Sequence, residues 1–433
     1  MSVEQDVKVV ESCMVTPSEE TPRKGLWISP IDLTWATRGH TPTVHLYLPG
    51  SGPVDGFFDV PRLKAALAKA LVAFYPLAGR LGMDSNGRAE IDCTGEGALF
   101  VVALSDLTVE DFSKLKPSRE LKRLFIPRVE DYSPPLMCGL QVNFLKGGGV
   151  AIGMTLHHTS ADAMSAFHFL QTWAAFSRDA AAAAALELPC HERTLLRPRS
   201  PPVVHPDALT VFCPRVGKSE PPGAVENVIF VLSKDQVDAI KRACTGRADG
   251  GRVSSFCAVS AHVWRCLCVA RQLPADATTR LTFPANIRRS LRPPLPDTYF
   301  GNGIVMLGAV AKVQDIVCSD ELASVAGRIR DVIRRMDDEL VRSVIDHLEM
   351  AGSQTFMPSG SMPVTELKVV SWRGMPVYDA DFGWGKPVAM HRAVQPHGGI
   401  ICLIDDDGGS MRIVLSAEPG IVKDFERLLH AKF

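Results

Sequence analysis

The chain has 433 residues, 46% of them hydrophobic and 22% charged, with a net charge of −1. This length and composition predict an ordinary globular protein of two or three domains. A nearly neutral charge excludes broad electrostatic binding to nucleic acid or to an anionic membrane. The acidic N-terminus lacks a signal-peptide core, and no apolar run is long enough to predict a membrane span. Eleven cysteines without metal-ligand spacing are typical of reduced thiols, so we expect a cytoplasmic protein.

The first half of the chain mixes predicted strands and helices. Strands with apolar or alternating residues are predicted over 7–15, 40–47, 88–92, 136–145 and 150–156. Amphipathic helices are predicted over 60–74 and 163–177. Asn86-Gly87 and Gly147-Gly148-Gly149 indicate hairpin turns, and the six alanines over 180–185 indicate a surface loop or a frayed helix.

Prolines cluster between Arg197 and Gly223, which predicts a long crossover. We therefore expect an N-terminal lobe over 1–196, a crossover over 197–224 and a C-terminal lobe over 225–433. In the second lobe, strands are predicted over 225–232, 366–372, 399–404 and 411–416, and helices over 233–244, 254–267, 319–350 and 421–431. Because the elements mix without a regular βαβ rhythm, the class is α/β or α+β in two lobes.

The pair His157-His158, with Asp162 four positions after the second histidine, follows the apolar strand 150–156. An imidazole is the natural general base near neutral pH, and a nearby carboxylate can orient it. The alternative is a buried histidine bonded to the backbone, with Asp162 as N-cap of a helix that begins near Ala163. The motif alone favours this alternative.

A second unusual stretch is Asp381-Phe382-Gly383-Trp384-Gly385, in which two glycines allow tight turns around a tryptophan. Its structural interpretation is a loop whose aromatic rings fill a core while Asp381 pairs with an arginine. Together the two motifs resemble the plant BAHD acyl-CoA-dependent acyltransferases. The stretches His40-Thr41-Pro42, 73–81 and Tyr299-Phe300-Gly301-Asn302 are similar to the hydroxycinnamoyl-CoA transferase branch, and the likeness covers essentially the whole chain.

The resemblance implies an α/β fold of two chloramphenicol-acetyltransferase-like lobes, with a channel at their interface. A segment near Ala380–Ile401 would swap back to the first lobe. The implied reaction is direct acyl transfer from a CoA thioester in a ternary complex, with no cofactor and no metal. His158 would be the general base, and Asp162 would turn away from the channel and stabilise the loop.

Further roles come from the same resemblance. The Trp372 indole N–H would donate to the oxyanion, and Asp381 would pair with Arg288 to hold the geometry of the lobes. For CoA, a helix N-terminus is a suitable phosphate site, with charge added by an arginine. The implied CoA-binding residues are Ser254, Ser255, Phe256 and Arg289 or Arg292, and the implied structural residues are Arg288, Gly383, Trp384 and Gly385.

The family is usually monomeric, and the expected donors are p-coumaroyl-, caffeoyl- or feruloyl-CoA. The candidate acceptor-binding residues are Thr41, Thr43, His45, Met357 and Val370. Met357 stands where shikimate and quinate transferases have an arginine for the acceptor carboxylate, while Val370 replaces a threonine and His45 a tyrosine. Losing an arginine–carboxylate pair costs about 2–5 kcal/mol. We therefore expect an amine (putrescine, agmatine or tryptamine) or a neutral polyol such as glycerol, with shikimate or quinate as the alternative acceptor.

Other classes are less consistent with the sequence. A zinc hydrolase would need His-Glu-x-x-His spacing and a third ligand, and a serine hydrolase of the common type would need Gly-x-Ser-x-Gly; neither pattern occurs. The remaining non-enzyme alternative is a protein of this fold that binds acyl-CoA without turnover.

Overall fold

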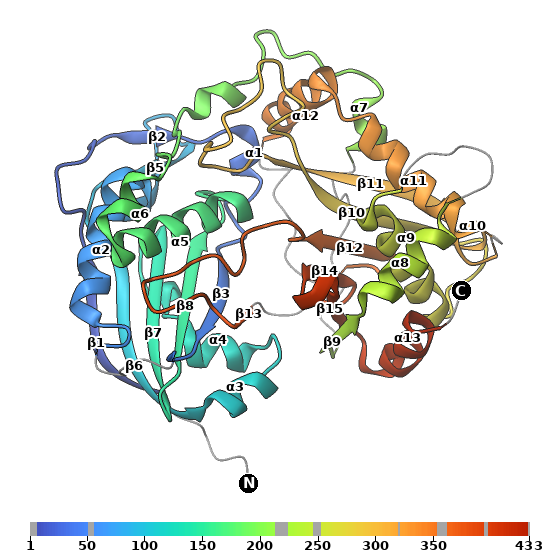
Figure 1. The fold of residues 1–433 in the computed structure, drawn as a ribbon. Coiled ribbons are helices and arrows are strands. Elements are labelled where there is room, and N and C mark those ends of the chain that lie inside the picture. The colour runs from blue at the N-terminus through green and yellow to red at the C-terminus, as the bar shows by residue number, and fades with distance from the viewer. Residues whose placement is uncertain are drawn as a thin grey trace. The chain divides into compact units, whose positions relative to one another are not determined.

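The computed structural model describes residues 7–50, 56–212, 224–245, 253–318, 321–352, 362–393 and 397–431. The chain divides into two compact units (Figure 1). The first contains Met1–Arg197, Pro296–Gly303 and Met375–Gln395, and the second contains Pro198–Leu295, Ile304–Gly374 and Pro396–Phe433. Each unit has a six-stranded mixed sheet flanked by helices, which is the predicted fold class.

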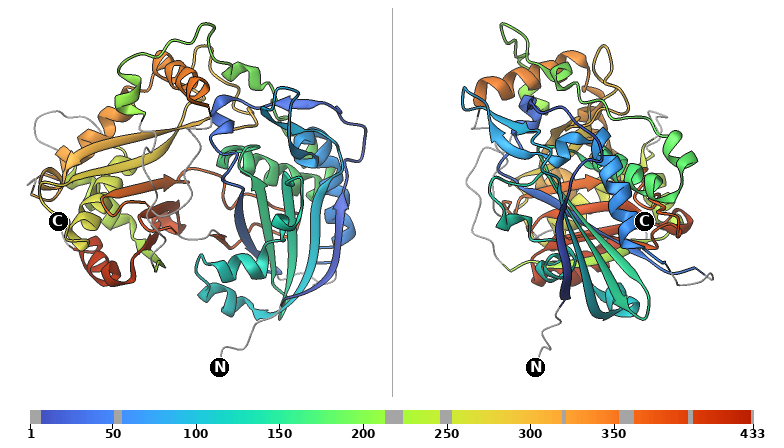
Figure 2. Two further views of the ribbon diagram at one scale, coloured as in Figure 1. Left: turned by 180° about the vertical axis from the view of Figure 1, so that it is seen from behind. Right: turned by 90° about the vertical axis from the view of Figure 1, so that its left-hand side faces the viewer.

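The first sheet has the strand order β1-β6-β7-β8-β3-β13. Its strands are β1 (Val7–Val15), β6 (Ala98–Thr108), β7 (Cys138–Lys146), β8 (Val150–His157), β3 (His40–Tyr47) and β13 (Ala389–Arg392). Only β6 and β7 run parallel, and the other neighbours are antiparallel. Figure 2 shows the twist of this sheet from behind and from the side. Strand β13, within the segment expected to swap near 380–401, lies beside β3 although most of the chain separates them.

Helices cover both faces of this sheet. On one face lie α2 (Val60–Ala73) and α5 (Ala163–Arg178), with the short α6 (Ala180–Ala184) after α5 (Figure 1). The predicted apolar stripe of α2 is buried against α5 and the sheet, and the Trp173 indole N–H donates to the Leu63 carbonyl at 2.9 Å. On the other face, α3 (Val109–Lys114) and α4 (Arg119–Phe125) pack Phe112 and Phe125 into a second apolar cluster.

Strand β8 lies inside the sheet between β7 and β3, and every residue in it is buried, as the largely apolar run 150–156 predicts. Gly153 lets α4 approach the strand closely. A Cβ atom at Gly153 would lie 1.8 Å from the Phe125 carbonyl oxygen, so no larger residue fits without moving the backbone. This close packing fixes the strand that ends at His157.

A small sheet joins β2 (Gly25–Trp27), β5 (Ala89–Asp92) and β4 (Arg80–Met83), and the short helix α1 (Pro30–Leu33) follows β2. The Asn86-Gly87 turn connects β4 and β5, where Gly87 has a φ of 78°. The hairpin predicted at Gly147–Gly149 connects β7 and β8. Both turn predictions are confirmed.

The second sheet has the order β11-β10-β12-β14-β15-β9. Its strands are β11 (Ile304–Lys312), β10 (Thr278–Asn286), β12 (Glu366–Ser371), β14 (Ile400–Asp405), β15 (Met411–Ala417) and β9 (Glu226–Leu232). The helices of this unit are α7 (Ala208–Val211), α8 (Lys234–Ala243), α9 (Ser255–Ala270), α10 (Val313–Val317), α11 (Leu322–Arg334), α12 (Asp338–Ala351) and α13 (Val422–Leu429). Helix α9, predicted to be buried, packs beside α8, α11 and α13.

One predicted element is wrong. The single helix expected over 319–350 is two helices, α11 and α12, because Asp337 leaves the helical conformation and caps α12 through the Leu340 amide. Its apolar periodicity continues on both sides of the break, so periodicity alone could not reveal it. Strands β2, β6, β10, β11 and β13 were not predicted.

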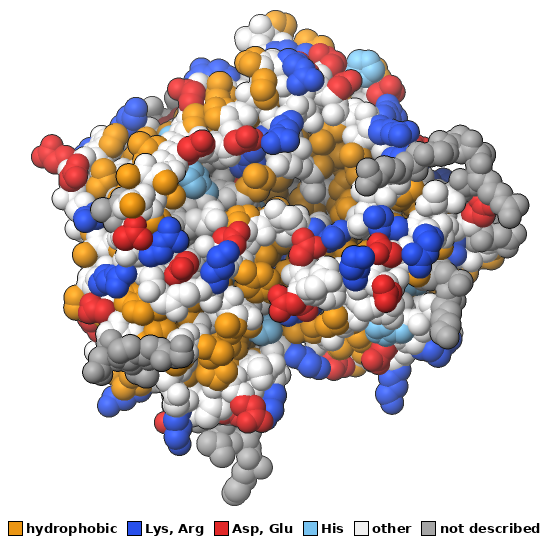
Figure 3. Space-filling model, viewed as in Figure 1, with side chains coloured by type: hydrophobic (Ala, Val, Ile, Leu, Met, Phe, Trp, Pro, Cys, Tyr) orange, Lys and Arg blue, Asp and Glu red, His pale blue; other side chains and the backbone are white. Residues whose placement is uncertain are grey.

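None of the described helices is long and apolar enough to cross a membrane. On the face drawn in Figure 3, basic and acidic side chains are interspersed, as the net charge of −1 suggests.

Candidate active site

His158 lies directly after the end of β8, on a loop that leads into α5. Its amide N–H donates to the Gly39 carbonyl at 2.9 Å, and its own carbonyl accepts from the Asn302 side chain at 2.8 Å. Its neighbour His157 is buried, with Nδ1 2.8 Å from the Thr159 hydroxyl. The two histidines therefore differ: His157 is a structural residue of the core, and His158 is half-buried.

The His158 ring is stacked on Trp35. The ring centroids are 4.0 Å apart and the planes differ by 6°. Nδ1 of His158 is buried and has no hydrogen bond to another residue that the structure describes, so Nε2 is the ring nitrogen better suited to proton transfer. The stack restricts the direction in which this nitrogen can point.

Burial lowers the pKa of His158 to about 4. The backbone of His158 and the carboxylate of Asp162 raise the pKa again in part, whereas Arg38 and Arg392 lower it further. The imidazole is therefore neutral at pH 7 and can accept a proton. A base with this pKa is a weak proton acceptor.

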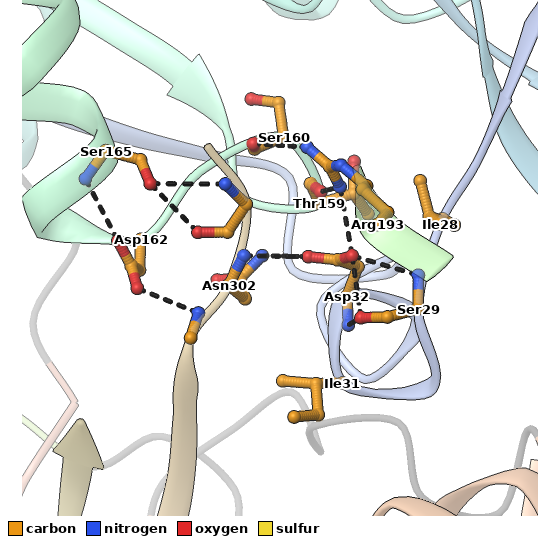
Figure 4. A network of polar contacts seen from close by, with 12 residues as sticks. Ile28, Ser29, Ile31, Asp32, Thr159, Ser160, Asp162, Ser165, Arg193 and Asn302 are labelled. Atoms are coloured by element: carbon orange, nitrogen blue, oxygen red, sulfur yellow. Dashed lines mark hydrogen bonds and ion pairs between the residues drawn. The ribbon is translucent and has the colours of Figure 1, made fainter. Parts of the chain in front are cut away.

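Asp162 is the N-cap of α5. Its Oδ1 accepts from the Ser165 amide at 3.0 Å and its Oδ2 accepts from the Gly303 amide at 2.9 Å, with only 2% of the residue exposed (Figure 4). Both carboxylate oxygens thus bind backbone groups. The capping role considered from the sequence is confirmed, and the prediction that Asp162 stabilises the loop agrees with this geometry.

The stretch Asp381–Gly385 is a tight loop of the first unit. Gly383 and Gly385 both have a φ of 102°, a conformation that favours glycine, and Asp381 Oδ1 accepts their amides at 2.8 and 3.0 Å. Phe382 is fully buried against Trp173, with ring centroids 4.7 Å apart. The interpretation of a loop whose aromatic rings fill the core is confirmed.

Trp384 completes this loop by stacking on Phe58, with centroids 5.0 Å apart, while the Arg62 guanidinium lies 4.4 Å from the Trp384 ring centroid. The expected pair between Asp381 and Arg288 joins residues of different units and stays a prediction. Arg288 is 1% exposed, and its amide donates to Asn286 Oδ1 of the same unit at 3.0 Å.

The other residues proposed for chemistry and CoA lie in the second unit. Trp372 directly follows β12, is buried, and donates its amide to the Leu403 carbonyl at 2.9 Å. Ser254 is the N-cap of the 16-residue helix α9 and accepts from the Cys257 amide, with Ser255 and Phe256 in its first turn. Arg289 is exposed.

The candidate acceptor residues are divided between the units. Thr43 and His45 are buried in β3, where they pair with Arg392 and Met390 of β13, and Thr41 is half-buried. Val370 is half-buried in β12. Met357 lies outside the described residues.

Burial lowers the pKa of His45 to about 4, opposed by a Val377 backbone group, so this ring is neutral at pH 7. Trp35, which packs on the proposed base, was not predicted. Trp35 lies five residues before His40 in a segment without regular apolar spacing, so no periodicity connects it to His158.

Comparisons with known proteins show the family of the chain. Residues 5–428 match the Transferase family. The chain is 44% identical to putrescine hydroxycinnamoyltransferase 1 of Oryza sativa subsp. japonica over 98% of each chain, and 38% identical to shikimate O-hydroxycinnamoyltransferase of Nicotiana tabacum over 98% of this chain and 99% of that one. The crystal structure of vinorine synthase has the same fold, with a TM-score of 0.75 at 22% identity, covering 97% of this chain and 96% of that one. The chain therefore belongs to the Transferase family, the BAHD acyltransferases that its two motifs resemble, and is an acyltransferase.

Proposed function

We propose that the protein transfers a hydroxycinnamoyl group from a CoA thioester to a small amine such as putrescine. The observation that carries the proposal is the neutral, half-buried imidazole of His158, fixed at a strand end and stacked on Trp35. The rice relative named for putrescine shares 44% identity over nearly the whole chain, which supports the amine.

The reaction needs no acyl-enzyme because a thioester is already activated. The free amine attacks the thioester carbonyl, a C–N bond forms, and the carbonyl oxygen becomes an oxyanion. His158 Nε2 takes a proton from the attacking nitrogen. The C–S bond then breaks, and the imidazolium returns the proton to the leaving thiolate, so that the products are an amide and free CoA.

A weak base suits an amine better than an alcohol. A free amine is nucleophilic before it loses a proton, and its N–H becomes acidic only after the C–N bond has formed. An alcohol must give up its proton as it attacks, which demands a stronger base. The lowered pKa of His158 therefore favours the amine.

The charge near His158 acts in the same direction. Arg38 and Arg392 both lower the pKa of His158 while Asp162 raises it, so the two arginines add positive charge near the ring. Positive surroundings also favour the unprotonated form of a bound amine.

The same arginines support a second candidate, an alcohol that carries a carboxylate, such as shikimate or quinate. Positive charge from Arg38 and Arg392 would attract that carboxylate. The tobacco relative is named for shikimate and is 38% identical.

Further roles belong to the same proposal. Trp372 is the proposed oxyanion donor, and the N-terminus of α9 with Arg289 is the proposed site for CoA phosphates. We propose p-coumaroyl-, caffeoyl- or feruloyl-CoA as donor, a cytoplasmic location and a monomer without cofactor or metal.

The test is thiol release from p-coumaroyl-CoA with putrescine, agmatine, tryptamine, glycerol, shikimate or quinate as acceptor. His158→Ala should abolish turnover, while His430→Ala, at an exposed histidine of α13's end, should not. Fastest turnover with an amine supports the proposal. Fastest turnover with shikimate or quinate overturns the amine, and no release with any acceptor overturns catalysis in favour of binding alone.

A further inference from the structure

Three successive carbonyl groups of the loop at His158 accept hydrogen bonds from buried side chains. Figure 4 shows the bonds from Arg193 to Thr159 and Ser160, and Asn302 bonded to Asp32. The His158 carbonyl accepts from Asn302 Nδ2 at 2.8 Å. The Thr159 and Ser160 carbonyls accept from Nη1 and Nη2 of Arg193 at 2.9 and 2.7 Å. Two side chains from distant parts of the sequence thus set the direction of the backbone that carries the proposed base.

Asp32 ties these two donors together. Its Oδ2 lies 3.0 Å from Arg193 Nη1, and its Oδ1 accepts from both the amide and Nδ2 of Asn302 at 2.9 Å. The two N–H bonds of the Asn302 carboxamide are therefore both used, one on Asp32 and one on the His158 carbonyl. Asp32 and Asn302 are fully buried and Arg193 is 1% exposed.

Capping of a short helix does not account for this arrangement. Ser29 and Asp32 already form a capping box on α1, with the Ser29 hydroxyl 2.7 Å from Asp32 Oδ2. A four-residue helix needs neither Arg193 nor Asn302 for that box.

Stability alone is also a weak explanation. A buried ion pair gains little net stability, because desolvation offsets the attraction between the charges. Through Arg193, the pair holds the carbonyl groups of Thr159 and Ser160, and Asn302, which is also bound to Asp32, holds that of His158.

We propose that Asp32, Arg193 and Asn302 are positioning residues that hold the His158 loop in the geometry required for acyl transfer. The inference rests on the proposed role of His158 as general base. A misplacement of a reacting group by about 1 Å can reduce the rate on the order of 10²-fold. The network acts through the backbone and does not touch the substrate.

Asp32→Asn keeps the shape of the side chain and removes its charge. The matched control is Asp346→Asn in α12, because Asp346 is 1% exposed and also pairs with an arginine, 2.7 Å from Arg199 Nε, in the second unit. We expect Asp32→Asn to lower kcat on the order of 10²-fold while KM for the thioester changes less than about threefold. Asp346→Asn should lower the thermal midpoint comparably and leave kcat within about threefold of the wild type.

A second pair of variants keeps the test independent of one substitution. Arg193→Lys retains a charge that can pair with Asp32 and one carbonyl, and should recover part of the kcat lost in Arg193→Met. Equal losses in the two variants would contradict positioning, as would a kcat decrease in Asp32→Asn no greater than that in Asp346→Asn.

A readout that does not depend on activity separates this inference from the proposed function. In protein labelled with ¹⁵N-histidine, the His158 ring signals are those lost in His158→Ala. Asp32→Asn should shift them, and Asp346→Asn should not. Unmoved signals in Asp32→Asn overturn the inference. If the wild type releases no thiol, the proposed function fails, and shifted ring signals still support the positioning of His158.

Discussion

Asp162 offers a direct test of the distinction between a capping carboxylate and a proton relay. Asp162→Ala removes the acceptor of the Ser165 amide, a cap that contributes about 1 kcal/mol, and leaves the Gly303 amide unpartnered at a cost of about 1–3 kcal/mol. The expected loss in the free energy of unfolding is therefore about 2–4 kcal/mol. Asp162→Ser restores the cap, because serine is an equally good N-cap, and should recover about 1 kcal/mol of that loss.

Urea unfolding followed by circular dichroism measures these differences, and thiol release at a temperature where all variants are folded measures their activity. Both Asp162 variants should retain more turnover than His158→Ala. The reasoning is refuted if Asp162→Ala is as stable as the wild type or if Asp162→Ser gains nothing over Asp162→Ala. A loss of turnover in Asp162→Ser equal to that in His158→Ala would indicate a relay.

Three further predictions concern the core and the base. Burial lowers the pKa of four histidines to about 4 and that of a fifth to about 3, so below pH 6.5 the unfolded chain binds more protons than the folded chain. The thermal midpoint should therefore fall as the pH drops from about 6.5 to 4. A constant midpoint would contradict this. These residues are His45, His157, His158, His191 and His262. Trp35→Ala should lower kcat by about tenfold while Trp35→Phe, which keeps a stacked ring, stays close to the wild type in thiol release. Gly153→Ala should prevent folding, because its Cβ would lie 1.8 Å from a backbone oxygen. Gly327→Ala on α11, where the nearest atom to the new Cβ is 3.8 Å away, should instead stabilise the chain by about 0.5–1 kcal/mol. Differential scanning calorimetry of both variants checks these outcomes.

Local patterns predicted much of the framework around the site. The apolar run 150–156 defined β8, and the stripe from Leu63 to Phe74 defined α2, because a buried strand and an amphipathic helix each leave their own periodicity. Strand β13 could not be found this way. Its four residues, Ala389–Arg392, are stabilised by pairing with β3, which lies more than 300 residues earlier in the chain.

The candidate site divides along the same line. His158 and Asp162 lie close together in the sequence and were predicted, and the capping geometry of Asp162 follows from its place before α5. Asp32 left a weak local signal in the Ser29-Pro30-Ile31-Asp32 capping pattern. Arg193 left none, because its contacts with Thr159 and Ser160 depend on tertiary packing.

The late position of β13 and of the Asp381–Gly385 loop affects how the first unit is made during translation. Phe382 and Trp384 pack beside Phe58, and β13 covers the edge of β3. A nascent chain of only the first 197 residues therefore has a sheet with one open edge and a core that still lacks Phe300, Phe382 and Trp384. The first unit can be completed only after residue 395 has emerged, and until then the nascent chain presents an unpaired strand to other chains.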